Sequence, residues 1–119
     1  MTTDRAVLAH LITADDWAAN REQTHLRPPS LDECGFVHLS TPEQVHLPAN
    51  RLFAGRCDLL LLICDPDRLG AEIRWEPGVP TDPASMLFPH LYGPLPVDAV
   101  IEVREYPPGP DNAFAPVTR

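Results

Sequence analysis

The sequence predicts a single small α+β domain built from short strands and short helices. Its 119 residues are enough for one hydrophobic core and too few for two. Its 15 prolines exceed twice the usual share of about 5%, which disfavours long helices. The order strand–helix–strand–helix followed by three strands predicts two short helices and five or so short, mixed or mainly antiparallel strands. Residues 1–106 would form this domain, and residues 107–119 a proline-rich C-terminal tail.

The first 30 residues predict a strand, a helix and a loop. Ala6–Ile12 is apolar enough for a strand. Thr13 then has the side chain of a helix N-cap, with two aspartates in the first turn, so we expect a helix to about Arg21. Residues 24–30 include two consecutive prolines and predict a loop.

Residues 35–41 predict the second strand. Its period-two pattern turns Val37 and Leu39 toward a core, and Phe36, His38 and Ser40 toward the opposite face.

The second helix is predicted to begin at Ser40-Thr41-Pro42-Glu43, which offers a hydroxyl cap, an early proline and the glutamate of a capping box. It would carry Val45, Leu52 and Phe53, with either a kink at Pro48 or a break there into two short pieces. Ser40 therefore has two interpretations: it caps this helix, or it belongs to a binding site.

The second half of the chain predicts three strands. Residues 58–64 form the most apolar segment and predict a central strand buried on both faces. After a turn, residues 71–76 predict the next strand. Residues 77–96 contain six prolines and predict a rigid loop. Residues 99–105 alternate in polarity, as a last, half-exposed strand does.

The charged residues restrict the classes of partner. A net charge of −8 argues against nucleic acids and anionic membranes, because both require a basic surface. The chain has no lysine, which excludes a lysine Schiff base and the lysine of a phosphate-binding P-loop. All nine cationic residues are arginines, which suit two-pronged capture of carboxylate or phosphate. We therefore expect a small anionic metabolite as the partner.

The cysteines and the apolar runs predict a cytoplasmic protein. Cys34, Cys57 and Cys64 are odd in number and lack a CxxC spacing, so we expect neither a disulfide framework nor a metal site. Residues 1–16 carry charges where a signal peptide has its apolar core. The longest apolar run, residues 59–64, is too short to span a bilayer.

The segment FPHLYGPL holds the best candidate site residues. In an extended segment, residues two apart share a face, so His90 and Tyr92 would point the same way. They form either a proline-stiffened structural turn or an acid–base pair held on one strand. Arg74 and Glu76 likewise share a face, which is either a solvated charged surface or a phosphate clamp next to a base.

Together these segments predict one concave pocket. We assign Glu76 and His90 as catalytic, and the ligand-binding role to His38, Ser40, Arg74 and Tyr92. His38 also has the interpretation of a half-buried histidine bonded to a carbonyl. Replacing a cleft-facing His90 by alanine should cost about 1 kcal/mol or less. The other histidines, which lack partners at useful spacing, are expected to be structural or surface residues: His10, His25 and His46.

Three segments of the chain resemble the DUF952 family of small bacterial proteins: GFVHLSTPEQV, LLLLICDPDRLGAEIRWE and FPHLYGPLPVDAVIEV. The resemblance extends from about Val7 to Val103. It implies a fold similar to that of the ADP-ribosyltransferases, in which two small sheets flank a cleft for a nicotinamide dinucleotide. NAD would then be the substrate, with no further cofactor specified.

The same resemblance implies roles for four residues. His38 would contact the ribose or phosphate, and Tyr92 would stack on the nicotinamide. Glu76 would hold the ribose hydroxyls while an oxocarbenium ion develops, and His90 would assist as proton donor or ligand. Two functions follow: an ADP-ribosyl-type transferase or hydrolase acting on a small anionic, nucleotide-like ligand, or a non-catalytic module that binds a ligand or a protein in the same cleft.

Overall fold

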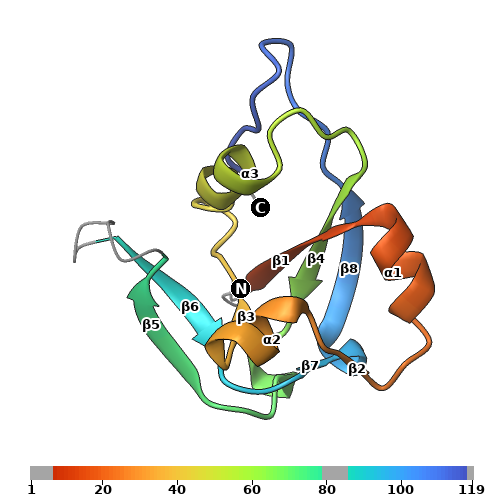
Figure 1. Ribbon diagram of the computed structural model, residues 1–119, viewed down its shortest axis with the longest axis vertical. Helices are drawn as coiled ribbons and strands as arrows, with labels where there is room; N and C mark the ends of the chain where they lie inside the picture. Colours follow the sequence, from red (N-terminus) through yellow and green to blue (C-terminus); the bar gives the residue numbers. More distant parts are fainter. Residues whose placement is uncertain (1–6, 79–85, 118–119) are drawn as a thin grey trace, which may run out of the picture.

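Three small antiparallel sheets and three short α-helices make up the part of the chain described by the computed structural model, residues 7–78 and 86–117 (Figure 1). None of these helices has the length and apolar composition needed to cross a bilayer. The elements in chain order are β1 (Leu8–Thr13), α1 (Ala14–Asn20), β2 (His25–Leu26), α2 (Pro29–Cys34), β3 (Val37–His38), α3 (His46–Leu52), β4 (Leu59–Cys64), the 3₁₀ turn η1 (Pro66–Arg68), β5 (Ile73–Pro77), β6 (Leu87–Leu91), β7 (Leu95–Pro96), η2 (Val97–Ala99) and β8 (Val100–Glu105).

The first sheet has the order β1-β4-β8, with β4 at its centre. Both faces of β4 are buried: Leu62 and Cys64 belong to one hydrophobic cluster, and Leu61 and Ile63 to another. The first cluster fills the space toward the second sheet, and the second packs against α3 and the C-terminal segment. The predicted central strand is therefore confirmed, and so is the α+β class.

The second sheet has the order β3-β6-β5, and it corrects the loop predicted for residues 77–96. Residues 87–91 instead form β6, the central strand of this sheet. Pro89 is tolerated there because its carbonyl accepts a hydrogen bond from Leu39 N at 3.0 Å, just beyond the end of β3. The absent N–H of Pro89 would point to that same neighbour, so only one bond at the end of the pairing is lost.

A β-bridge joins the first and second sheets and removes the helix-cap interpretation of Ser40. Ala9 and Ser40 exchange backbone hydrogen bonds of 2.7 and 2.9 Å. Ser40 is therefore not a helix cap; α3 begins at His46, after a turn in which Thr41 N donates to Gln44 Oε1. Pro48 lies in the first turn of α3, where its missing N–H has no partner within the helix, so the predicted kink has no cause.

Two further elements near the N-terminus test the sequence interpretation. Thr13 caps α1 as predicted, because its hydroxyl accepts a hydrogen bond from Asp16 N at 3.2 Å. The loop predicted for residues 24–30 is wrong, because it contains β2 and the start of α2. Pro29 occupies the first turn of α2, a position that proline favours, and Gly35 ends the helix with φ of 86°. The chain thus has three helices and three sheets in its described part, against two of each expected.

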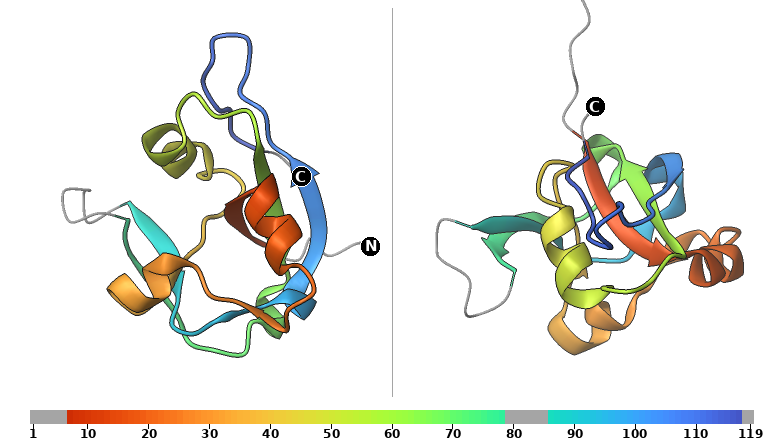
Figure 2. Two further views of the ribbon diagram at one scale, coloured as in Figure 1. Left: turned by 45° about the vertical axis from the view of Figure 1, so that its right-hand side comes forward. Right: turned by 90° about the horizontal axis from the view of Figure 1, so that it is seen from above.

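The C-terminal segment after β8 packs against α3. Phe114 is buried in the cluster of β4 and α3, and its backbone forms two hydrogen bonds with the Asn50 side chain, at 2.8 and 3.0 Å. Val117 N donates to the carbonyl of Pro42. Figure 2 shows this segment looping out beyond β8 and returning to the body of the domain.

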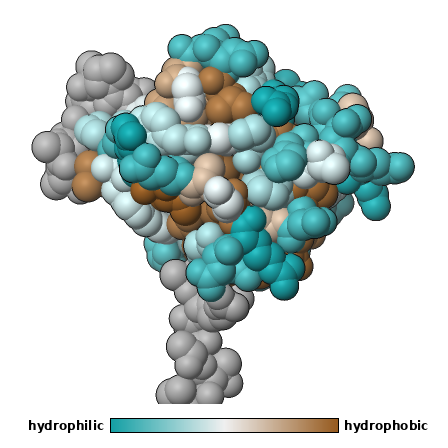
Figure 3. Space-filling view, turned by 90° about the horizontal axis from the view of Figure 1, so that it is seen from below, coloured by the Kyte–Doolittle hydropathy of each residue, from teal (hydrophilic) through white to brown (hydrophobic). Residues whose placement is uncertain are grey.

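Several large apolar side chains are exposed, among them Trp75 on β5 and Ile101 and Val103 on the edge strand β8. On the face shown in Figure 3, hydrophobic residues gather near the centre and hydrophilic residues surround them.

The buried and exposed apolar positions predict different stability losses. Leu61 is 1% exposed in the middle of β4, so Leu61→Ala should lower the free energy of unfolding by about 2–5 kcal/mol. Val103→Ala, at a position 42% exposed, should change it by about 0.5 kcal/mol or less. Urea denaturation of both variants checks this, and equal losses would contradict the central position of β4.

Candidate functional site

Polar side chains gather on one face of the β3-β6-β5 sheet. The antiparallel register places Val37, Leu91 and Ile73 side by side on the core face. The next row, His38, His90 and Arg74, points to the opposite face. Glu76 lies two residues beyond Arg74 on β5 and therefore on this same face. The alternation predicted from the sequence thus brings these polar groups together.

A single carboxylate oxygen connects the group. Glu76 Oε1 accepts a hydrogen bond from the Tyr92 hydroxyl at 2.6 Å and lies 2.9 Å from His90 Nδ1. These two bonds, that of Tyr92 first, lower the pKa of Glu76, so the carboxylate is ionised at neutral pH. Because an ionised carboxylate only accepts, Nδ1 of His90 must carry the proton and donate it. The hydrogen bond from Tyr92 to Glu76 raises the pKa of Tyr92 and keeps its hydroxyl protonated.

The His90 ring is enclosed by aromatic side chains. It is only 2% exposed, and the Phe36 ring stacks on it at 4.0 Å with an interplanar angle of 10°. The His38 ring meets it edge-on at 5.3 Å. Since the His90 side chain is almost fully buried, the small cost expected for His90→Ala is corrected upward: this change enlarges the cavity beside it and removes one of the two hydrogen bonds to Glu76.

The second ring nitrogen of His90 is unpaired. Nε2 is buried and has no hydrogen-bond partner among residues 7–78 and 86–117. A buried polar atom left without a partner costs about 1–3 kcal/mol. Such atoms are rare in folded proteins, and each requires a physical reason.

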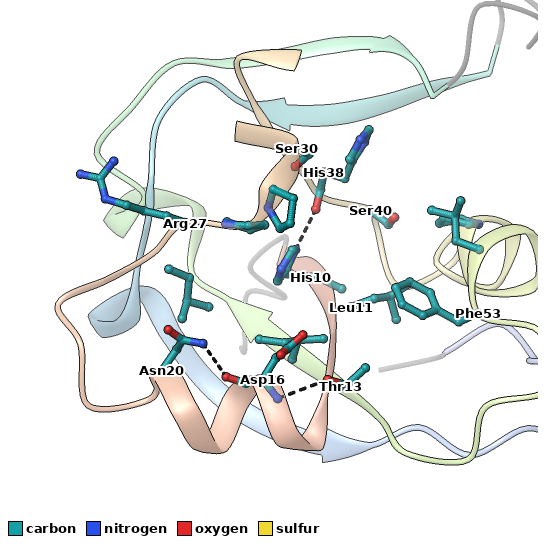
Figure 4. A pocket seen from close by; sticks show the side chains of 17 residues that line it. His10, Leu11, Thr13, Asp16, Asn20, Arg27, Ser30, His38, Ser40 and Phe53 are labelled. Atoms are coloured by element: carbon teal, nitrogen blue, oxygen red, sulfur yellow. Dashed lines mark hydrogen bonds between the residues drawn. The ribbon is translucent and has the colours of Figure 1, made fainter. Parts of the chain in front are cut away.

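Two adjoining cavities lie beside this group. The smaller, of about 130 Å³, is bordered by His90, His38 and Phe88 of the sheet and by three residues of α3: Pro48, Arg51 and Leu52. The larger, of about 410 Å³, lies between β1, α1 and the segment 26–30, as Figure 4 shows. Both share four lining residues: His38, Ser40, Pro48 and Leu52.

The predicted site residues fall into two groups: those that line a cavity and those that only contact other residues of the site. His38, Ser40 and His90 line one or both cavities. Glu76 and Tyr92 line neither cavity. Glu76 contacts His90, and Tyr92 contacts Glu76. Arg74 lies farther out: its guanidinium is 4.5 Å from the centre of the Tyr92 ring and pairs with Glu72 at 3.1 Å. In the described residues, no three His, Cys, Asp or Glu side chains are grouped as a metal site requires.

His10 is a site residue that the sequence interpretation missed. Its side chain is buried, lines the larger cavity and places Nδ1 2.9 Å from the carbonyl oxygen of His38. Because a carbonyl only accepts, Nδ1 is the donor and Nε2 of the neutral ring carries a lone pair. The missed signal lies in β1, where His10 occupies the same face as the apolar residues Leu8 and Ile12.

Burial makes His10 a pH-sensitive element of stability. Desolvation lowers the pKa of His10, and that of the neighbouring His38, below its usual value in the folded protein. Below about pH 6.5 the unfolded chain binds a proton that the folded ring does not, so stability falls as pH falls.

We therefore expect His10→Gln to lose less stability than the wild type between pH 7.5 and pH 5.5. The difference is limited to about 1.4 kcal/mol per pH unit for one proton. Urea denaturation at the two pH values measures it. Replacing the exposed His25 by Gln serves as the control and should keep the wild-type dependence. A His10→Gln variant with unchanged pH dependence would refute the assignment.

Comparisons with known proteins place the chain in a family. The model of the family described as "Protein of unknown function (DUF952)" matches residues 11–103. The crystal structure of protein CC0527 from Caulobacter crescentus is similar, with a TM-score of 0.73 and 27% identity over 91% of this chain and 92% of that chain. The solution NMR structure of CC0527 gives a TM-score of 0.73 and 29% identity over 90% of each chain. A comparison with curated proteins finds no match. The chain therefore belongs to the DUF952 family.

Proposed function

We propose that this protein is an enzyme that acts on a small molecule and uses His90 to transfer a proton. The observation that carries the proposal is the Nε2 atom of His90: it is buried and has no partner in the described part of the chain, and the His90 side chain lines the smaller cavity. The opposite ring nitrogen is held by an ionised carboxylate. A substrate proton would satisfy the unpaired nitrogen.

The chemistry of this arrangement is general acid–base catalysis. Glu76 fixes the ring with the proton on Nδ1, which leaves the lone pair of Nε2 directed away from the carboxylate. Nε2 would take a proton from a substrate O–H or N–H, and Glu76 would stabilise the resulting imidazolium. The Tyr92 hydroxyl holds Glu76, and the Phe36 ring holds the plane of His90. Proton transfer by a positioned side chain contributes about 10²–10⁴-fold to a rate.

The DUF952 resemblance implies an ADP-ribosyltransferase-like fold, so the first reaction to test is cleavage of the nicotinamide–ribose bond of NAD. That reaction requires an activated hydroxyl as acceptor, and His90 would supply the base. The larger cavity, about 410 Å³, falls within the range of about 300–1,000 Å³ usual for small-ligand sites. Tyr92 would need to rearrange to stack on nicotinamide, because Arg74 covers its ring and Glu76 binds its hydroxyl.

The test has two steps on the purified full-length chain. Thermal-shift screening of NAD, nucleosides, nucleotides and small organic acids identifies a ligand, because binding to the folded state raises the melting temperature. Chromatography then measures nicotinamide release from NAD, or product formation from the ligand found.

We expect His90→Gln to lower turnover about 10²–10⁴-fold while ligand binding changes far less, because glutamine fills the space without accepting a proton. Glu76→Gln should lower turnover as well, since a neutral amide does not stabilise the imidazolium. His25→Ala, at an exposed position on β2, should have no effect. A ligand that binds without turnover in the wild type would identify a non-catalytic module. Turnover that survives in His90→Gln would disprove the role of His90.

A further inference from the structure

We infer that the larger cavity binds a ligand that presents several hydrogen-bond donors, hydroxyl or amino groups, and no anionic group at that end. This inference deepens the proposed function by naming the substrate class. It rests on the proposed function in one respect: the ligand in the larger cavity is taken to be the substrate of His90, because the two cavities share His38 and Ser40.

Three of the side chains that line this cavity offer acceptor atoms without a partner in the described residues. His10 uses Nδ1 as a donor to the His38 carbonyl, which leaves Nε2 as an acceptor on a side chain more than nine-tenths buried. Asn20 uses its amide N to bind the carbonyl of Asp16, which leaves its side-chain oxygen. The Asp16 carboxylate forms no hydrogen bond or ion pair within the described part, and Figure 4 shows it pointing into the cavity.

Donor groups are scarce in the same lining. Among the described residues of this lining, Arg27 is the only arginine, and Figure 4 shows its guanidinium pointing away from the cavity. Ser30 and Ser40 carry hydroxyls that donate or accept equally well. The larger cavity is therefore an acceptor-rich surface, and an anionic group placed there would face the Asp16 carboxylate. The Arg56 guanidinium interacts electrostatically with Asp16, but it does not line the cavity and is paired with Asp58.

The remaining walls define the size and polarity of the ligand. Apolar side chains from three segments surround the polar groups: Leu26, Pro28 and Pro29 on one side, and Leu11, Leu52 and Phe53 on the other. A cavity of about 410 Å³ with such walls suits a compact, partly apolar molecule of nucleoside or amino-sugar size. Its donors would pair with His10, Asp16 and Asn20.

The shared wall relates this ligand to His90. Ser40 and His38 border both cavities, so a hydroxyl at the far end of a ligand in the larger cavity would enter the smaller one. There it would lie beside the His90 ring, whose buried Nε2 has no partner in the described residues, and a small shift of that ring would let the two pair. A donor-rich molecule would thus pair with Nε2 of His10 at one end and with Nε2 of His90 at the other.

The test compares probes that differ in charge, on the full-length protein. Adenosine represents hydroxyl donors, putrescine represents ammonium donors, and inorganic phosphate and succinate represent anions. Titrations followed by ¹H–¹⁵N NMR should show adenosine or putrescine shifting the amides of Asn20 and Ser30, while phosphate and succinate leave those amides unchanged. Binding of an anion at these amides, or absence of binding by both donor probes, would overturn the inference.

Asp16→Asn and Asp15→Asn form a matched pair for the same titrations. The two aspartates are neighbours in the first turn of α1, and Asp15 does not line the cavity. Asp16→Asn should weaken putrescine about tenfold and adenosine far less, because an amide keeps an acceptor but loses the charge. Asp15→Asn should leave both affinities unchanged.

His10→Phe should weaken whichever donor probe binds, and His10→Gln, which restores an acceptor, should recover part of the affinity. Equal effects of the two aspartate variants, or no effect of either His10 variant, would refute the assigned contacts. His90→Gln should retain probe binding at the larger cavity. Loss of turnover with retained binding therefore tests the proposed function, and altered probe preference tests the substrate class.

Discussion

The site depends on one carboxylate oxygen that accepts two hydrogen bonds. Glu76 Oε1 holds both the Tyr92 hydroxyl and Nδ1 of His90, and these donors keep the carboxylate ionised. Without Glu76, a fully enclosed imidazole would have two unpaired nitrogens instead of one. The register of β5 on β6 makes the contact, because Glu76 pairs with Phe88 and so lies diagonally across from His90.

The two sheets use their faces differently, and this arrangement makes room for the cavities. The first sheet is covered on both faces by apolar clusters, so it serves as a scaffold. The second sheet buries only one face in the core and places imidazoles and carboxylates on the other. The bridge between Ala9 and Ser40 brings the sheets together at the point where His10 and His38 meet. The cavities lie where the polar face of the second sheet approaches the first sheet and α3.

Local patterns were sufficient to predict much of this arrangement. Alternation placed His38, Arg74, Glu76, His90 and Tyr92 on one face, and the apolar run 59–64 identified β4. Other features depend on tertiary contacts that no local pattern contains. Pro89 suits a central strand only because β3 ends beside it. Of the residues predicted to start a helix, Ser40 forms the bridge to Ala9 and Thr41 begins a turn, so the helix starts later. His10 was missed because its role requires the carbonyl of His38, 28 positions away.

Two hydrogen bonds between the Asn50 side chain and the Phe114 backbone connect the C-terminal segment to the walls of the cavities. Asn50 belongs to α3, the helix that also contributes Pro48 and Leu52 to the walls of both cavities. Removing Phe114 from its apolar cluster would remove both hydrogen bonds to Asn50, and with them a tertiary contact that holds this helix in place. The proline-rich end of the chain is thus anchored to the helix that forms a wall of both cavities.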